Sequence, residues 1–484
     1  MAEVRTERPF FRLFLSILIG AGIAMLSVLL ASLDFKTAIA VMLGLCIGGI
    51  FIYFLNQRIL TYFLIMILGF GIPFNLDINL FIRRYVGVTS IDIGITLLSS
   101  IMLYFVFYYE HIMKGIKRFY SNRTMLMAMF LYIGACILSF YNAMSIELSV
   151  FEIVRLIMLL IIFYMVMNLG SRENISIFLI TISACVILEF LLAYYQYTTG
   201  RSLGLAAFGE RSQEELGFIS RASGTFGHAN GLAYFFELLL PLLLAMIIVE
   251  DKKILKLWYI ISFLFGFFGL IITFSRGGWL ATAISLPMVF IFLYRKRFTQ
   301  LRYYPAIFTV FIVVIILGSI FYPTIERRLI AYDYGSAGTR GPLNLAAISI
   351  IKQYPITGVG INNFALIFRT YDTTGGSALF KTQAHIVHNL FLGVWAETGT
   401  IGILAFVWIF ISAFIVASRL LLKVPFWYSG ILIGVMAGIL AQLLHGMVDP
   451  GFRILMNTSM LVYSMLGLIG AVSVLYKTQQ KQLA

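Results

Sequence analysis

Apolar residues fill long, nearly unbroken runs along this chain, and short polar segments separate the runs. Each run has roughly the 17–25 residues that a helix needs to cross a bilayer. The runs fall at residues 12–32, 37–55, 59–75, 90–108, 124–141, 151–169, 176–197, 231–249, 256–274, 278–294, 305–322, 400–418, 427–447 and 455–475. The pattern therefore predicts an all-α polytopic membrane protein with about 14 transmembrane helices.

The composition supports this class of protein. Of the 484 residues, 61% are hydrophobic and only 12% are charged, whereas about a quarter of the residues in a soluble domain are charged. The net charge of +14 would suit nucleic acid, but the basic residues stand in short clusters between apolar runs, as in topology-setting loops. We therefore expect a lipid bilayer, and no nucleic acid, as partner. The first run is too long for a signal-peptide core and is expected to be the first span.

The distribution of lysine and arginine predicts the orientation in the membrane. With the N-terminus in the cytoplasm, the cytoplasmic segments carry 20 basic residues and the short outer segments carry five. Basic residues in short loops stay on the cytoplasmic side, so both termini are predicted to be cytoplasmic. The two longest outer segments are then 198–230 and 323–388.

This orientation gathers titratable and cationic residues on the outer side. Four of the five histidines lie there, with three arginines and one aspartate. They are His228, His385, His388, His445, Arg221, Arg276, Arg340 and Asp449. These residues stand beside the segments that are long enough to build a pocket, which favours an active site on the outer face.

The outer loop 323–388 contains a second helical pattern. Gly341-Pro342 precedes the pattern, where proline can open a helix, and Tyr354-Pro355 ends it. The apolar positions are Leu343, Ala346, Ile350 and Ile351. We expect an amphipathic helix on the outer membrane surface. The following segment, 358–364, predicts a tight turn that seats the loop, because neither a strand nor a third glycine supports a dinucleotide site.

Three residues of the outer set offer proton chemistry. His388 can take a proton from a hydroxyl, as histidine side chains do in general acid–base catalysis, with an interfacial capping role as the alternative. His385 lies about one helical turn earlier and either supports His388 or lies at the interface. Asp449 can orient a histidine and stabilise its protonated form, or it ends a helix as part of an Asp-Pro turn.

The outer arginines are candidates for binding phosphate. Arg276 presents a planar fork of donors that matches phosphate oxygens, and the two glycines after it let a bulky anion approach; the alternative is a snorkelling arginine. Arg340 is expected near a helix N-terminus, which attracts anions. Arg221 either holds a lipid-linked phosphate or orders its loop. His228 and Asn230 are interpreted as turn and cap residues.

Three charged residues are predicted within the membrane. Arg155, Glu189 and Glu237 are costly there and often mark function, which keeps a proton-coupled transporter as an alternative. We favour structural pairing of Arg155 with one of the two glutamates, since no series of midplane charges accompanies them. The three cysteines lie in apolar runs without metal-ligand spacing, so no metal site is expected.

The spacing around His388 resembles a known signature. His388-Asn389, nine residues and then Gly399-Thr400-Ile401-Gly402 resemble the His-Asn-x9-Gly-x-x-Gly pattern of the O-antigen ligase and polymerase superfamily (WaaL- and Wzy-type glycosyltransferases). The likeness covers roughly residues 200–460. Its other matching positions are Arg221, Ser275-Arg276-Gly277, Arg340, Tyr354-Pro355, Gly358-Val359-Gly360 and Asp449.

The resemblance implies a GT-C-like membrane glycosyltransferase with a large extracytoplasmic loop containing amphipathic helices. Such an enzyme takes a glycan from undecaprenyl diphosphate and joins it to an acceptor sugar, with inversion and without a cofactor or metal. By this likeness His388 is the general base, and Arg276 and Arg340 bind the diphosphate. The assigned set is His388 and Asp449 as catalytic residues, Arg276, Arg340 and Arg221 as diphosphate ligands, and His385, Asn389 and His228 in support.

Three regions are expected: N-terminal transmembrane helices at 1–199, a ligase-like catalytic region at 200–460, and a helix end with cytoplasmic tail at 461–484. The implied location is the bacterial cytoplasmic (inner) membrane, with the active site on the periplasmic or extracellular side. A ligase uses a lipid-A core sugar or a protein as acceptor, and a Wzy-type polymerase uses another lipid-linked repeat. A lipid-linked glycan transporter and a non-catalytic assembly partner are the further alternatives.

Overall fold

The computed structural model describes residues 57–74, 76–82, 87–113, 115, 119–205, 208–210, 221–294, 336–373 and 385–483. The chain divides into two units, residues 1–61 and 62–484. Of the first unit only residues 57–61 are described, and they form the start of a helix. The arrangement below is that of the second unit.

Helices dominate the described residues. In chain order the elements are α3 (Gln57–Phe70), β1 (Asp77–Leu80), β2 (Ile91–Gly94), α4 (Ile95–Met113), α5 (Arg123–Leu138), η1 (Ser139–Asn142), α6 (Ile146–Met167), α7 (Arg172–Thr199), η3 (Gly224–Phe226), α9 (Ala229–Val249), α10 (Lys253–Ile272), α11 (Arg276–Tyr294), α13 (Ser336–Gln353), α14 (Phe364–Ile367), η5 (Phe368–Tyr371), α15 (Leu390–Leu420), α16 (Phe426–His445), α17 (Gly451–Ile454) and α18 (Met456–Leu483).

Ten helices in the described ranges are long and apolar enough to cross a membrane. They are α4, α5 with η1, α6, α7, α9, α10, α11, α15, α16 and α18. The expected span at 59–75 is a shorter helix, α3, of 14 residues. The expected spans at 12–32, 37–55 and 305–322 lie outside the described residues. The predicted class, a helical polytopic membrane protein, is confirmed.

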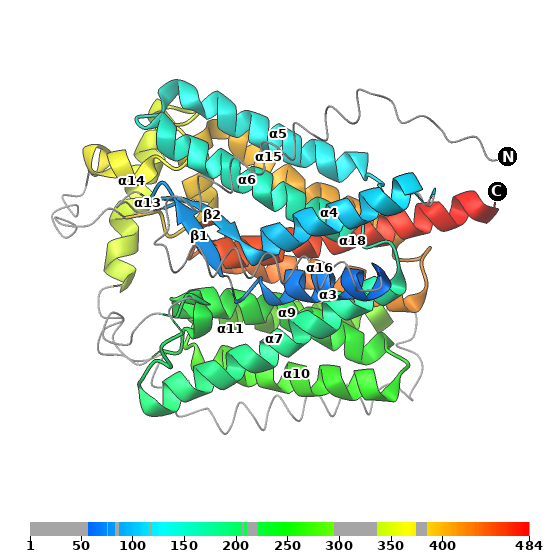
Figure 1. Ribbon diagram of the computed structural model, residues 1–484. Helices are drawn as coiled ribbons and strands as arrows, with labels where there is room; N and C mark the ends of the chain where they lie inside the picture. Colours follow the sequence, from blue (N-terminus) through cyan, green and yellow to red (C-terminus); the bar gives the residue numbers. More distant parts are fainter. Residues whose placement is uncertain are drawn as a thin grey trace, which may run out of the picture. The chain divides into compact units, whose positions relative to one another are not determined.

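Three helices form the centre of the bundle. The most apolar windows of α9, α16 and α18 are 89%, 72% and 94% buried, against 39% for α10 and α11. The helix α9 packs against α10, α11 and α16, while α18 packs against α6, and α15 against α5. In Figure 1, α5, α6 and α15 lie on one side of α16 and α18, and α7, α9 and α10 lie on the other. A helix that is apolar on every face, such as α9, is therefore a core helix.

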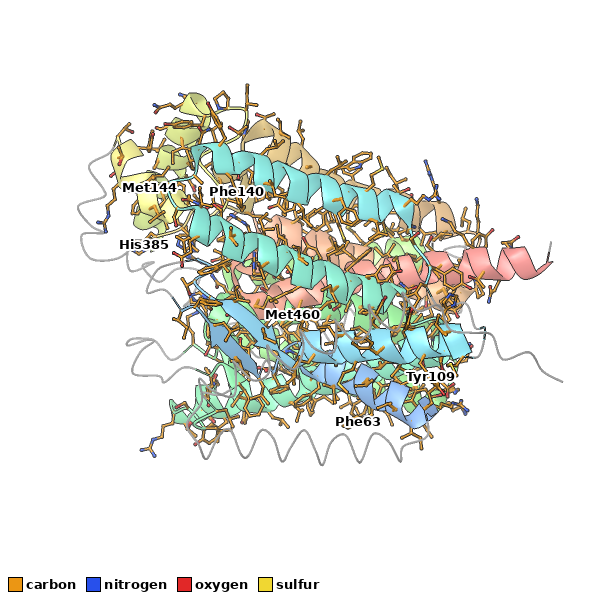
Figure 2. The ribbon with its side chains drawn as sticks, turned by 45° about the horizontal axis from the view of Figure 1, so that its top comes forward. Phe63, Tyr109, Phe140, Met144, His385 and Met460 are labelled. Atoms are coloured by element: carbon orange, nitrogen blue, oxygen red, sulfur yellow. The ribbon has the colours of Figure 1, made fainter. Side chains whose placement is uncertain are left out.

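The elements that connect the spans gather at one end of the helices. The hairpin β1–β2 lies at the same end as α13 and α14 (Figure 1). In Figure 2, His385, Phe140 and Met144 lie at this end and Tyr109 lies near the opposite one. This end carries the histidines that the sequence assigns to the outer face.

The turn at residues 358–364 fastens the connecting segments to the bundle. Asn363 accepts the backbone N–H of Ser145 at 2.7 Å and donates to Ser149 Oγ at 2.8 Å. Asn362 donates to the carbonyl of Leu148 at 3.0 Å, so three bonds reach α6 or its N-cap residue, Ser145. The turn therefore seats the loop, as the glycine pattern predicts.

Helix α13 differs from its prediction in two respects. It begins at Ser336, so Pro342 lies inside the helix and not at its start. Its expected apolar face is buried, at Leu343, Ala346 and Ile350. That face packs against protein and not against lipid, on a cluster formed by Val359, Phe364, Phe368, Val387 and Ala396. The chain that follows α13 folds back and covers this face, so the face does not rest on lipid as expected; the place of α13 at the membrane surface stays a prediction.

The charged residue pairs within the membrane also differ from expectation. Arg155 binds Glu152, one helical turn earlier, through two bonds of 2.6 and 2.9 Å. It does not pair with Glu189 or Glu237. Glu189 instead accepts the hydroxyl of Thr225. The predicted pairing of Arg155 with one of these two glutamates is therefore wrong, because a nearer carboxylate on the same helix, Glu152, compensates the Arg155 charge.

The two glycines of the His-Asn-x9-Gly-x-x-Gly signature are needed for the path of the chain. Gly399 has φ 66° and ψ −170° inside α15, which kinks there. A β-carbon at Gly399 would lie 2.1 Å from the carbonyl oxygen of Ile356. One at Gly402 would lie 1.9 Å from Thr398 Oγ1. A side chain at Gly399 would displace the segment that closes against α15, and one at Gly402 would displace Thr398 within α15.

Replacement of Gly399 by alanine is expected to destabilise the fold by about 2 kcal/mol or more, because it adds both a left-handed φ and a backbone clash. The measurement is thermal unfolding of purified protein in detergent. Gly134→Ala is the matched control, since Gly134 lies in α5 with nothing within 4 Å of the added carbon. Equal unfolding temperatures for the two variants would contradict the conformational role of Gly399.

Candidate functional site

His388 and Asp449 face each other where α15 begins and α16 ends. His388 Nδ1 lies 3.7 Å from Asp449 Oδ2. This separation is longer than a hydrogen bond, so the attraction is electrostatic. The His388 side chain is 31% exposed, but its Nδ1 atom is buried and has no hydrogen-bond partner. The buried edge of the ring is therefore turned toward the carboxylate, and the ring retains an accessible part.

Asn389 fixes the start of α15 next to this pair. Its side-chain oxygen accepts the N–H of Leu392 at 3.0 Å, which caps the helix. Its amide donates to the carbonyl of Met447 at 2.9 Å. The N–H of Leu390 donates to the carbonyl of Gly446 at 2.7 Å. These bonds tie the His388 segment to the loop that carries Asp449.

The Asp449 carboxylate is held from several sides. Asn230 donates to Oδ2 at 2.8 Å, and the N–H of Gly451 donates to Oδ1 at 3.0 Å. Burial alone would raise the pKa of this carboxyl. Nearby His388, His445 and His228 and the Asn230 amide outweigh burial and hold the pKa well below its usual range. Asp449 therefore remains a carboxylate at neutral pH.

Arg221 is joined to Asp449 through one side chain. Its Nη2 donates to Asn230 Oδ1 at 3.1 Å, while the Asn230 amide donates to Asp449. Arg221 Nε also donates to the carbonyl of Thr273 at 3.0 Å. Arg221 therefore orders the local loops and belongs to the polar array around Asp449, while its expected contact with phosphate stays a prediction.

Arg276 is the first residue of α11 and follows a tight turn. Phe274 in this turn has a φ of 53°, and the N–H of Ser275 donates to Thr273 Oγ1 at 3.2 Å. Because Arg221 binds the carbonyl of Thr273, both arginines approach the same turn. Arg276 is half-buried at the N-terminus of its helix, a position that favours anions.

The remaining predicted residues lie around this array. Arg340 on α13 is half-buried and within electrostatic range of Tyr234 and His445. His228 is exposed and caps α9, since its Nδ1 accepts the N–H of Asn230 at 3.1 Å. Burial, His388 and Arg369 lower the pKa of His385. His228 therefore has the capping position expected from the sequence.

Glu237 and His445 form a buried pair that sequence reasoning does not identify. His445 Nδ1 lies 2.9 Å from Glu237 Oε2, and the His445 ring stacks on Tyr234 at a centroid distance of 4.2 Å. Tyr234 in turn donates its hydroxyl to the carbonyl of Asp449. Two features of the sequence could have pointed to this pair. They are Glu237 within a predicted span and the four-residue spacing of His445 and Asp449.

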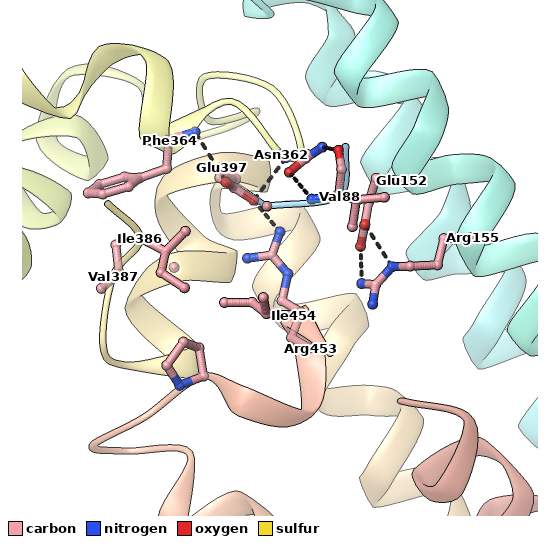
Figure 3. Close-up of a pocket in the computed structure, with 13 residues that line it drawn as sticks. Val88, Glu152, Arg155, Asn362, Phe364, Ile386, Val387, Glu397, Arg453 and Ile454 are labelled. Atoms are coloured by element: carbon pink, nitrogen blue, oxygen red, sulfur yellow. Dashed lines mark hydrogen bonds and ion pairs between the residues drawn. The ribbon is translucent and has the colours of Figure 1, made fainter. Parts of the chain in front are cut away.

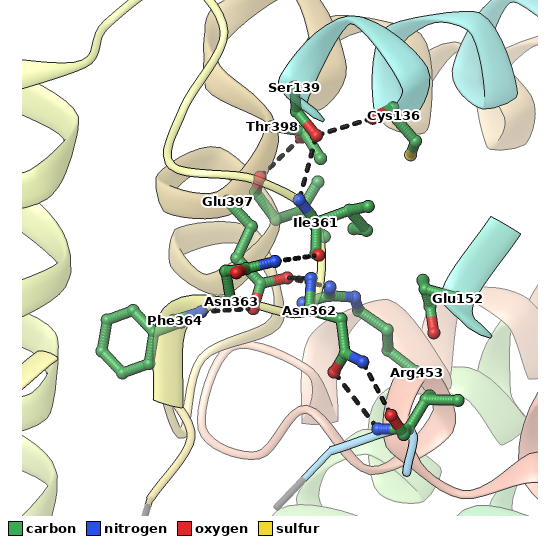
Figure 4. A network of polar contacts seen from close by, with 12 residues as sticks. Cys136, Ser139, Glu152, Ile361, Asn362, Asn363, Phe364, Glu397, Thr398 and Arg453 are labelled. Atoms are coloured by element: carbon green, nitrogen blue, oxygen red, sulfur yellow. Dashed lines mark hydrogen bonds and ion pairs between the residues drawn. The ribbon is translucent and has the colours of Figure 1, made fainter. Parts of the chain in front are cut away.

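A second polar region lies beside the His388 segment. Arg453 pairs with Glu397, which also accepts the N–H groups of Asn362 and Phe364 at 3.0 and 3.1 Å. Figure 4 shows this network joining the 361–364 turn to α15 and α17. Figure 3 shows the small pocket that it borders, whose lining includes Ile386, Val387 and Pro450, neighbours of His388 and Asp449 in sequence. Glu397 and Arg453 were not predicted as site residues.

Within the described ranges no group of three His, Cys, Asp or Glu side chains is placed to hold a metal ion. The cationic groups near Asp449 in this part of the chain are instead arginines and histidines.

Part of the site lies in a region of the chain that matches a known family. No curated protein matches the chain. Residues 261–407, from α10 to the middle of α15, match the family described as O-antigen ligase. The matched segment contains Arg276, Arg340 and His388, whereas Arg221 and Asp449 lie outside it. The match confirms the resemblance of this membrane protein to the O-antigen ligase and polymerase superfamily.

Proposed function

We propose that this protein transfers a glycan from undecaprenyl diphosphate to an acceptor sugar on the outer side of the cytoplasmic membrane. The family match supports glycan transfer of the ligase or polymerase type. The observation that carries the proposal is the continuous polar array from His388 through Asp449 and Asn230 to Arg221, which ends at the Arg276 turn. It combines a proton acceptor with fixed cations.

His388 acts as the general base. With Nδ1–H directed at the Asp449 carboxylate, Nε2 carries the lone pair that accepts the proton of the acceptor hydroxyl. As the proton leaves, the acceptor oxygen bonds to the anomeric carbon and the bond from that carbon to the diphosphate oxygen breaks. Asp449 stabilises the imidazolium that forms. A single displacement of this kind inverts the anomeric configuration.

The arginines hold the leaving group. The diphosphate departs with its negative charge, and Arg276 and Arg221 approach the same turn while Arg340 lies nearby on α13. Fixed cations in a partly dry site stabilise developing charge without reorganisation. The start of α11 adds the partial positive charge of its helix dipole.

A transporter is less well supported than an enzyme. The intramembrane charges that favoured a transporter each contact a partner: Arg155 binds Glu152, and Glu237 binds His445. Of the two enzyme types, a ligase is the first proposal and a Wzy-type polymerase is the alternative. The two differ in the acceptor, a lipid-A core sugar against another lipid-linked repeat.

One assay tests the proposal as a whole. Purified protein is incubated with undecaprenyl-diphosphate-linked glycan and each candidate acceptor, in the presence of a chelator, and product length is resolved. Single additions to a core acceptor indicate a ligase, and a ladder of repeats indicates a polymerase. Absence of any transfer, with or without added divalent metal, contradicts the proposal.

His388→Ala is expected to reduce turnover by about 10²–10⁴-fold, the usual contribution of a general base. Donor binding should be retained because the diphosphate is held by other residues. The measurements are single-turnover transfer and binding of the lipid-linked donor. His111→Ala is the control, since His111 ends α4 near the other end of the bundle. Near-normal transfer by His388→Ala would contradict the assignment of His388 as the general base.

Arg276→Ala is expected to weaken donor affinity as well as rate, because the guanidinium contacts an anion in both the ground state and the transition state. Arg276→Lys should recover only part of the loss, since an ammonium keeps the charge but not the two-pronged geometry. Donor titration in single-turnover transfer separates the two effects. Arg419→Ala, at an exposed position in the last turn of α15, serves as control. Unchanged donor affinity in Arg276→Ala would contradict the assignment of Arg276 as a ligand of the diphosphate.

The orientation is tested by labelling single cysteines in intact cells, in a background without the three native cysteines. A cysteine at position 336, in the outer loop, should react with a membrane-impermeant reagent. One at position 480, near the C-terminus, should react only after the cells are opened, since the basic residues place this end in the cytoplasm. The reverse result would overturn both the topology and the outward-facing site.

A further inference from the structure

A small pocket lies beside the segment that carries His388. Its volume is about 30 Å³, and its wall includes Ile386, Val387 and Pro450 (Figure 3). Val387 directly precedes His388 and Pro450 directly follows Asp449, so each of these wall residues is about 3.8 Å, from Cα to Cα, from a member of the pair. The pocket therefore adjoins both residues to which the proton transfer is assigned.

Two arginines and two glutamates also line this pocket. Arg155 binds Glu152 through two bonds, and Arg453 pairs with Glu397. The charges of the wall therefore balance. An anion would meet two carboxylates in this pocket, and a metal ion would meet two guanidinium groups. Charge balance thus favours a neutral polar group as the occupant.

Arg453 has N–H groups that the protein leaves unused. Its Nη2 pairs with Glu397, whereas its Nε is without a hydrogen-bond partner. In the described part of the chain Nη1 makes no hydrogen bond either, and Figure 3 shows this nitrogen directed toward Ile386. The Arg453 side chain is 14% exposed, so it can be reached from the pocket. Because a guanidinium has five N–H donors, a largely buried one needs more than a single acceptor.

The size of the pocket limits what can enter it. One water molecule needs roughly 10–15 Å³ of such space. A pocket of about 30 Å³ therefore holds a hydroxyl or a hydroxymethyl group but not a sugar ring. Guanidinium groups donate to hydroxyl oxygens, and carboxylates accept hydroxyl hydrogens, so the wall offers both partners that a hydroxyl needs.

We propose that this pocket is a subsite for the acceptor sugar, in which Arg453 donates to a hydroxyl or hydroxymethyl oxygen and a carboxylate of the wall accepts the hydrogen. The inference rests on the proposed function and names the part of the protein that selects the acceptor. The ring that carries this group stays outside the pocket, beside His388. Holding one hydroxyl of the ring in this way directs a neighbouring hydroxyl to the base.

The acceptor is a better match for this pocket than the glycan of the donor. The pocket adjoins His388 and Asp449, which act on the acceptor hydroxyl in the proposed mechanism. Arg221 and Arg276, which are assigned to the diphosphate of the donor, instead meet at the turn before α11. None of the residues of that turn lines the pocket.

Gly393 gives a way to fill the pocket without disturbing its wall. It belongs to α15 and lines the pocket. A β-carbon at this position would lie 3.6 Å from Arg453 Nη1 and 3.7 Å from Val387 Cβ. Both are ordinary van der Waals distances, so alanine fits the helix. Its methyl group takes the space proposed for the sugar hydroxyl.

The test compares Gly393→Ala with wild type in the full-length protein, with the lipid-A core or the lipid-linked repeat as acceptor, whichever supports transfer. The value of kcat/KM for the acceptor should fall about 10- to 100-fold, as expected for loss of a hydrogen bond to a charged group, while KM for the lipid-linked donor stays unchanged. Gly134→Ala in α5 is the matched control, with nothing within 4 Å of the added carbon, and should match wild type. Unchanged acceptor kinetics in Gly393→Ala, or a changed KM for the donor alone, overturns the proposal.

Acceptors that lack single hydroxyl groups identify the group that enters the pocket. Wild type should use one such deoxy acceptor poorly. Gly393→Ala should discriminate little between this deoxy acceptor and the complete one, because the substitution and the missing hydroxyl remove the same contact. Equal discrimination by the two proteins overturns the proposal.

Two further measurements make every result decisive. If Gly393→Ala does not fold, Ile386→Phe replaces it and fills the pocket from another wall; wild-type acceptor kinetics in this variant would overturn the proposal. If no acceptor supports transfer, the proposed function fails, and the subsite is tested by titrating wild type and Gly393→Ala with the lipid-A core oligosaccharide and with the lipid-linked repeat. Weaker binding to Gly393→Ala supports the subsite, and equal binding or none overturns it.

Discussion

The compensation of buried charge at Asp449 is the constraint on which the His388 end of this bundle depends. A carboxylate buried in an apolar interior needs nearby hydrogen-bond donors or opposite charges to compensate its own charge. Asp449 does so by drawing Asn230 from α9 and His388 from the start of α15 to the loop after α16. Three segments that are far apart in sequence are thereby held at one point. Loss of that carboxylate would leave His388 without its charged neighbour and Asn230 without its acceptor.

The same rule accounts for the second polar region. Arg453 and Glu397 compensate each other, and Glu397 uses both its oxygens on backbone N–H groups of the 361–364 turn. Just before this turn, residues 356 and 357 approach α15 closely because Gly399 leaves room for them, and Gly402 leaves room for Thr398 within α15. The glycines of the signature therefore serve chain path and packing, whereas His388 is the residue to which we assign the proposed chemistry. One short motif combines both requirements.

A glycosyl transfer needs its base and its leaving-group cations close together but not paired with each other. The structure achieves this separation with neutral groups. Asn230 stands between Arg221 and Asp449, so the guanidinium and the carboxylate share an amide instead of forming a direct ion pair. The serine hydroxyl of Ser275 occupies a similar position between His445 and the Arg276 turn. Such intermediates let each charge remain available to a substrate.

The sequence alone determined the helical membrane class, because the apolar runs have the length of a bilayer span. It also pointed to His388 through the spacing of this residue to Gly399 and Gly402. It also gave the buried face of α13. Only the tertiary structure decided that this face packs on protein, that Arg155 pairs with Glu152, and that Glu237 meets His445. The physical reason is that periodicity records local geometry, whereas the partner of a buried polar group depends on how helices pack. Asn230 and Asp449 are 219 residues apart, and no local pattern joins them.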